Sequence, residues 1–126
     1  MHAAQLEAYR TVQKTTMSGR ELEASVLNKA ALLLRQCQNS WDSEDRNDRL
    51  SEAVRYNQRV WSFFQNELAK PDNPLPKKLR EDILSLSLFI DKRLFEVLAM
   101  PSPEKLNAVI NINLNIAAGL CGTAGG

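Results

Sequence analysis

Few side chains in this 126-residue chain could take part in covalent or metal chemistry, and their spacing favours neither. His2 is the only histidine and lies at the start of the sequence, so no Ser-His or Cys-His pair can be expected. Together with His2, the two cysteines Cys37 and Cys121 give too few ligands for a zinc site. The cysteines are also too few and too far apart for a disulfide framework. We therefore expect neither catalytic residues nor a metal ion.

The acidic clusters have simpler explanations than catalysis. The segment 41–48 lacks the central glycine and the ligand order of a calcium-binding loop, and is better explained as a solvated linker that precedes a helix. The adjacent carboxylates of Glu81 and Asp82 lie on the polar face of a predicted helix. The glycines gather near the C-terminus and form no phosphate-binding loop. We therefore expect no cofactor and no enzymatic activity.

The composition is that of an ordinary globular protein, with 44% hydrophobic and 25% charged residues and a formal net charge of +1. The charges are spread evenly, so no basic block suggests binding to nucleic acid or to a membrane surface. No apolar run is long enough to span a bilayer, and residues 1–9 do not have the pattern of a signal peptide. With Cys37 as a buried free thiol, these features predict a cytoplasmic protein.

Helical periodicity predicts a single all-α domain over residues 1–120, followed by a flexible, glycine-rich tail at 121–126. A capping-box sequence that starts at Ser18 opens the second helix, and the proline-rich segment 70–76 separates the third helix from the fourth. Ser102 and Pro103 mark the start of the last helix, and Gly119 marks its end. The five expected helices cover residues 2–16, the segment from Ser18 to just before Trp41, 50–68, about 77–100 and 103–119.

One segment gives a conflicting pattern. From Ile110 to Ile116 apolar residues alternate with asparagines, which is typical of a β-strand. No other segment alternates, and a single unpaired strand is not stable. Helical spacing instead places Val109, Ile110 and Leu120 on one face with Ile116. We therefore predict a helix here.

The helix expected at 77–100 has more apolar surface than one buried face requires. A second stripe of apolar side chains runs about a third of a turn away from the first. We therefore expect this helix to lie at the centre of an antiparallel, bundle-like domain and to be covered from two sides. The second stripe would be covered by the chain's own helices, by a partner or by a second copy. The first stripe consists of Leu79, Ile83, Leu86, Ile90, Leu94 and Val97, and the second of Leu84, Leu88, Phe95 and Leu98.

Two asparagines occupy unusual places, because Asn57 and Asn113 each lie at the centre of an apolar face. An unpaired buried amide costs about 1–3 kcal/mol, so each must find a partner. They could bond to backbone or to each other and fix the helix register. Alternatively, they contact a partner protein, as could the core aromatics Trp61 and Phe64.

Several ordered segments of the chain resemble the bacterial flagellar protein family FlaF. Together they span about Tyr9 to Leu120, essentially the whole domain. They are Arg20-Glu21-Leu22-Glu23-Ala24, Asn57 to Phe64 with Val60 and Trp61, Asn73-Pro74-Leu75-Pro76, and Pro103 to Leu106 followed by Ile112-Asn113 and Ile116 to Leu120.

The resemblance implies a small cytoplasmic regulator of flagellum biogenesis, needed for flagellin production and secretion, that acts alongside the post-transcriptional regulator FlbT. Two mechanisms remain open. The protein could chaperone flagellin by binding one of its amphipathic helices, through the second stripe of the helix at 77–100 or through Asn57, Trp61, Phe64 and Asn113. It could instead act through FlbT or flagellin messenger RNA, although the near-zero net charge argues against direct RNA contact. A homodimer, or a structural homo-oligomer, is a third alternative.

Overall fold

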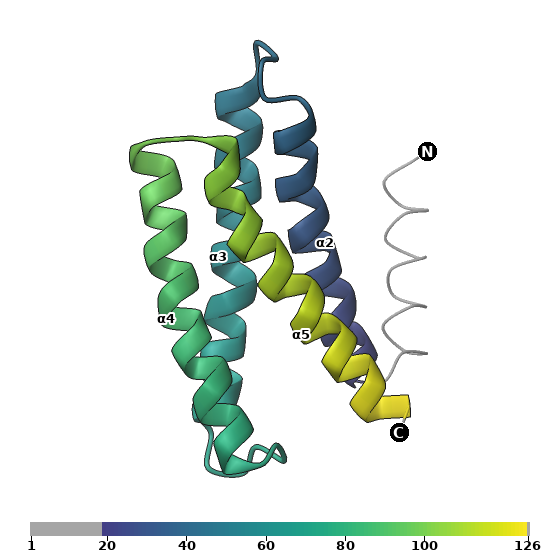
Figure 1. The fold of residues 1–126 in the computed structure, drawn as a ribbon. Coiled ribbons are helices and arrows are strands. Elements are labelled where there is room, and N and C mark those ends of the chain that lie inside the picture. The colour runs from purple at the N-terminus through teal and green to yellow at the C-terminus, as the bar shows by residue number, and fades with distance from the viewer. Residues whose placement is uncertain (1–18, 126) are drawn as a thin grey trace, which may run out of the picture.

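The structure is a computed structural model that describes residues 19–125, with side chains described for residues 19–121. In this part of the chain all regular structure is helical and no strand occurs (Figure 1). The helix expected at residues 2–16 and the capping residue Ser18 lie outside the described residues. The elements, in chain order, are α2 (Gly19–Asn39), α3 (Arg46–Ala69), α4 (Lys77–Ala99), the short 3-10 helix η1 (Pro103–Leu106) and α5 (Asn107–Gly125).

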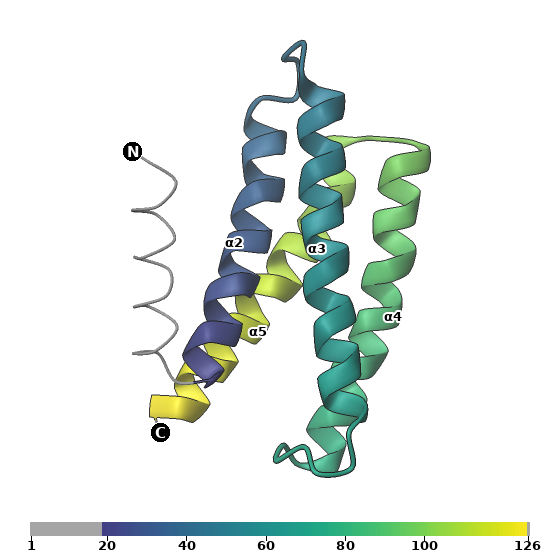
Figure 2. The ribbon, with the colours of Figure 1, turned by 180° about the vertical axis from the view of Figure 1, so that it is seen from behind.

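The helices α2, α3 and α5 enclose most of the core, and α4 lies at the edge. The most extensive contact joins α2 to α5, and α2 also packs along α3. The helix α4 runs antiparallel to α3 across the proline-rich loop, as expected, and packs mainly against it (Figures 1 and 2). The predicted arrangement around α4 is therefore not confirmed. Only one side of α4 is buried, through Ile83, Ile90, Leu94 and Val97.

The loop between α3 and α4 is fixed by Asn73 and by the prolines around it. The Asn73 Nδ2 donates a hydrogen bond of 3.0 Å to the carbonyl of Glu67, one of the last carbonyls of α3. Its Oδ1 accepts a hydrogen bond of 3.0 Å from the backbone N–H of Leu75. The Glu67 carbonyl also accepts a hydrogen bond of 3.3 Å from the backbone N–H of Lys70, so Asn73 reinforces the end of α3 and pairs the N–H of Leu75 in the turn. Pro76 then precedes the first helical residue of α4, where its missing N–H costs nothing.

The prediction of a helix over the alternating segment is confirmed, because Ile110 to Ile116 lies within α5. Ser102 and Pro103 open the η1 turn, which leads directly into α5. The predicted end of this helix at Gly119 differs from the structure, in which α5 continues to Gly125 and includes most of the expected tail. No glycine among the described residues has a positive φ, so Gly119 takes a helical conformation and does not cap the helix.

Candidate protein-binding surfaces

Three of the residues expected to bind a partner lie in the core and bond to one another. The Asn113 Nδ2 donates a hydrogen bond of 2.7 Å to Asn57 Oδ1, and the Trp61 Nε1 donates one of 2.8 Å to Asn113 Oδ1. The Asn57 Nδ2 donates to the carbonyls of Ala30 and Ala53, at 3.1 and 2.8 Å. All three of these side chains are 0% exposed. Their burial favours the structural role over partner contact.

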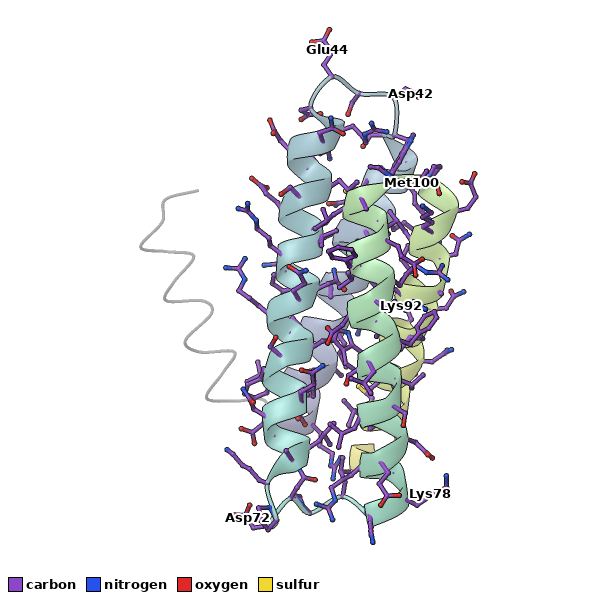
Figure 3. All side chains as sticks on the ribbon, turned by 90° about the vertical axis from the view of Figure 1, so that its left-hand side faces the viewer. Asp42, Glu44, Asp72, Lys78, Lys92 and Met100 are labelled. Carbon is purple, nitrogen blue, oxygen red and sulfur yellow. The ribbon has the colours of Figure 1, made fainter. Side chains whose placement is uncertain are left out.

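The second stripe of α4, by contrast, lies on the surface. Leu88 is 70% exposed, Phe95 71% and Leu98 45%, whereas Leu84 is half-buried at the edge of the core. We call these four residues the outer stripe. Figure 3 shows the molecule from the side on which α4 faces the viewer, with Lys92 on the helix and Met100 at its end. Met100, 71% exposed, extends the apolar surface beyond the helix end.

The outer stripe has the spacing of a helix-packing seam. Its residues follow one another at intervals of four, seven and three, which keeps them on one side of a helix, as in a coiled coil. The polar Asp91 occupies the one position of this seam that is not apolar. Its Oδ2 accepts a hydrogen bond of 2.9 Å from Gln65 Nε2 on α3. The remaining seam is apolar surface of the kind that soluble proteins usually cover with a partner.

A groove with a volume of about 1080 Å³ opens at the other side of α3, between the first turns of α2 and the second half of α3. There α2 and α3 diverge, and α5 crosses behind them (Figure 2). The loop residues Asn73 to Leu75 close one end of the groove. Half of the Phe63 side chain is exposed there. The other apolar residues that line it are Leu22, Val26, Tyr56, Val60, Trp61, Phe64, Leu68, Ile83, Ile116 and Leu120.

Charged side chains of both signs border this groove. Arg20 and Glu23 come from α2, and Arg59 and Glu67 from α3. Burial raises the pKa of Glu23; nearby Arg20 acts in the opposite direction and Glu67 adds to the rise. The groove is therefore apolar at its base and charged at its rim, an arrangement that suits an amphipathic helix.

Two of the predicted contact residues, Trp61 and Phe64, line this groove. Both are buried, with Trp61 0% and Phe64 5% exposed. Sequence reasoning missed the groove, because it forms where α3 diverges from α2 and α5, and helical periodicity does not indicate how helices cross. The available signal was Phe63, a large apolar residue outside the predicted buried face of α3 and next to Phe64. Adjacent residues of a helix face different sides of it, so Phe63 and Phe64 give α3 apolar side chains on two sides. Phe64 packs in the core, whereas Phe63 is 50% exposed.

The described residues contain no set of three or more histidine, cysteine or carboxylate side chains that could hold a metal ion. Among these residues, too, no helix is both long and apolar enough to cross a membrane. What the described part offers is two apolar surfaces, the outer stripe and the groove.

The described residues form a small helical domain with two exposed apolar surfaces. The chain belongs to the FlaF family, because the family model described as flagellar protein FlaF matches residues 5–120. This confirms the resemblance noted in the sequence and makes the chain a flagellar protein. Searches of curated proteins and of solved structures gave no match.

Proposed function

We propose that the protein binds flagellin in the cytoplasm and supports its synthesis and secretion as a non-enzymatic, chaperone-like regulator. The outer stripe of α4 would hold an amphipathic helical segment of flagellin. The observation that carries this proposal is the exposure of Leu88, Phe95 and Leu98 in a seam with helix-packing spacing. Membership of a flagellar protein family supports the choice of flagellin as the partner.

The physical argument concerns how strongly such a stripe could bind. Full burial of a leucine or phenylalanine side chain contributes about 1.5–3 kcal/mol, so three of them contribute about 5–9 kcal/mol. Lost translational and rotational freedom on association offsets about 4–15 kcal/mol of the total interaction energy. The net free energy of binding that remains after this cost is small, so we expect weak, rapidly reversible binding. A chaperone that must release its cargo for export requires binding of this kind.

The test of this function is Leu88→Asp, compared with Ser85→Asp as a matched control. Both place one new carboxylate at an exposed position of the same helix, but Ser85 lies in its polar sector. We expect both variants to keep their helicity and melting temperature, and only Leu88→Asp to lose co-purification of flagellin. Equal flagellin binding by wild type and Leu88→Asp would overturn the use of this stripe.

The same experiment separates the alternatives. If Leu88→Asp changes the sedimentation of the protein but not its flagellin binding, the stripe joins copies of this chain. If the protein acts through FlbT, a pull-down from flagellated cells recovers FlbT. If it acts through messenger RNA, the pull-down recovers flagellin only when nuclease is omitted. If Leu88→Asp unfolds the protein, the stripe belongs to the core.

A further inference from the structure

Asp91 interrupts the outer stripe of α4 with a carboxylate. It follows Leu88 by three residues and precedes Phe95 by four, so helical spacing places it between them on the same side of the helix. Its Oδ2 accepts a hydrogen bond of 2.9 Å from Gln65 Nε2 on α3. Its other oxygen, Oδ1, accepts no hydrogen bond from the described residues. One oxygen is therefore held in place and the other is left for a ligand.

No cation among the described residues neutralises this carboxylate. The carboxylates of Glu81, Asp82 and Glu96 on the same helix each pair with a basic residue one turn away, and Asp91 does not. Lys92 follows Asp91 directly, but adjacent residues of a helix face different sides, so Lys92 lies at the edge of the stripe (Figure 3). Asp91 is thus an exposed, unpaired charge in the middle of the surface that a partner would cover.

This charge restricts what can cover the stripe. A partner helix that buries Leu88 and Phe95 also removes water from the carboxylate between them. An ionised carboxylate that loses water without gaining an ion or hydrogen-bond partner opposes binding. The occupant must therefore bring donors to Asp91, and a cationic side chain does so most strongly, because hydrogen bonds between charged groups are the strong ones.

A second copy of this chain brings no such donor. In a parallel pair of α4 helices, each Asp91 lies opposite the Asp91 of the other copy, which places two like charges together. In an antiparallel pair, Asp91 lies opposite Leu88 or Phe95 of the other copy, and neither can neutralise it. Asp91 therefore opposes self-association through the outer stripe.

We infer that Asp91 selects the occupant of the outer stripe. It excludes a second copy and favours an amphipathic helix of flagellin that carries a lysine or arginine in the middle of its apolar face. The inference rests on the proposed function for the identity of the partner, and adds the chemistry by which that partner is recognised. A single polar position in an apolar seam fixes the partner and the register of helix pairs in this way.

The first experiment measures this selection with defined helices in place of flagellin. Two synthetic amphipathic peptides carry leucines at the spacing of the outer stripe and differ only at the central position, which is arginine in one and glutamate in the other. At low salt we expect the wild-type protein to bind the arginine peptide about tenfold more tightly, and Asp91→Arg to prefer the glutamate peptide. Both preferences should shrink as salt is added.

The matched control is Asp82→Arg, which makes the same change at an exposed position on the polar side of α4. It should keep the wild-type preference for the arginine peptide. Equal affinities of the wild type for the two peptides, or an unchanged preference in Asp91→Arg, would overturn the inference.

The second experiment measures self-association by sedimentation equilibrium. We expect wild type and Asp82→Leu to be monomers, and Asp91→Leu, whose stripe is then continuous, to form dimers at the same concentration. Adding Leu88→Asp to Asp91→Leu should restore the monomer, with equal helicity in all four proteins. A wild-type dimer that Leu88→Asp dissociates, a monomeric Asp91→Leu, or equal association of both leucine variants would each show that Asp91 does not exclude a second copy.

A third measurement, with flagellin itself, separates this inference from the proposed function. Flagellin that binds wild type but not Asp91→Arg supports both. Flagellin that binds the two proteins equally overturns the selection by Asp91 and leaves the proposed function standing. Flagellin that fails to bind wild type overturns the proposed function and the identity of the partner, whereas the peptide preference would remain a property of the surface.

Discussion

Asn113 on α5 donates a hydrogen bond of 2.7 Å to Asn57 on α3, at a point where both side chains are fully buried. The Asn57 amide also donates to the carbonyl of Ala30 on α2, so the pair joins the three helices that enclose most of the core. Buried amides of this kind are stable only when their partners are correctly placed. The pair therefore fixes the register of the three helices as well as contributing to stability.

The first prediction concerns this pair. Asn57→Ala should lower the free energy of unfolding by about 2–3 kcal/mol, because it leaves the Asn113 amide without its acceptor in the core. Asn113→Ala should cost a similar amount, and the double variant should cost less than the sum by about 1–2 kcal/mol. Urea denaturation of the four proteins measures these values. Strict additivity would mean that the two side chains do not interact.

The second prediction separates the packing of Trp61 from its hydrogen bond. Trp61→Ala should cost about 3–5 kcal/mol, because the fully buried ring leaves a cavity. Trp61→Phe keeps most of the apolar area but leaves Asn113 Oδ1 without the indole donor, so it should cost about 1–2 kcal/mol. Equilibrium denaturation compares the two variants. A negligible loss in Trp61→Ala, together with failure of flagellin binding, would instead make Trp61 a contact residue.

The third prediction concerns the two free thiols, Cys37 and Cys121, of which the first is buried and the second exposed. Burial raises the pKa of Cys37 above its ordinary value of 9.0. In the native protein, a thiol reagent at pH 8 should therefore modify Cys121 quickly and Cys37 only after unfolding. Mass spectrometry of the partly labelled protein identifies the modified residue.

The raised pKa of Cys37 also fixes the sign of a pH effect. The unfolded chain releases the thiol proton near pH 9.0, while the folded protein still retains it. The contribution of this group to stability is therefore constant below pH 9.0 and falls as pH rises from there toward the folded pKa. Cys37→Ala should show a shallower decline of melting temperature over this range than wild type does.

The α-helices of the described residues and most of their inner faces could be predicted from the sequence, because each depends on local spacing and on nearby prolines. The position of α4 could not. Its two apolar stripes indicated burial on both sides, but periodicity cannot distinguish a face covered by the core from one left exposed. Leu94 and Phe95 adjoin in the sequence and are equally apolar, yet one is fully buried and the other 71% exposed.

The polar contacts were only partly predictable for a similar reason. An asparagine in an apolar stripe must be paired, which the sequence indicates for both Asn57 and Asn113. Which partner each one finds depends on the crossing of α5 over α3, and that crossing involves residues more than fifty positions apart. The groove has the same origin, since it opens where α3 diverges from α2 and α5, an arrangement that exists only in three dimensions.

The fourth prediction follows from the helical conformation of Gly119. Glycine within a helix costs about 0.5–1 kcal/mol relative to alanine. A Cβ atom added at this position would meet no heavy atom within 4 Å, so the new methyl group causes no clash. Gly119→Ala should therefore raise the melting temperature of the protein. A lower melting temperature would mean that α5 ends at this glycine, as the sequence suggested.

The last prediction uses the neighbours Leu94 and Phe95 to test the one-sided packing of α4. Leu94→Ala removes a fully buried side chain and should cost about 2–5 kcal/mol. Phe95→Ala removes a larger side chain that mostly faces solvent, so the free energy of unfolding should change by no more than about 0.5 kcal/mol. The flagellin affinities should follow the opposite order, with Phe95→Ala weakened and Leu94→Ala unchanged at temperatures where it is folded. A large stability loss in Phe95→Ala would place the outer stripe in a homo-oligomer interface or in the core, and concentration-dependent melting would identify the interface.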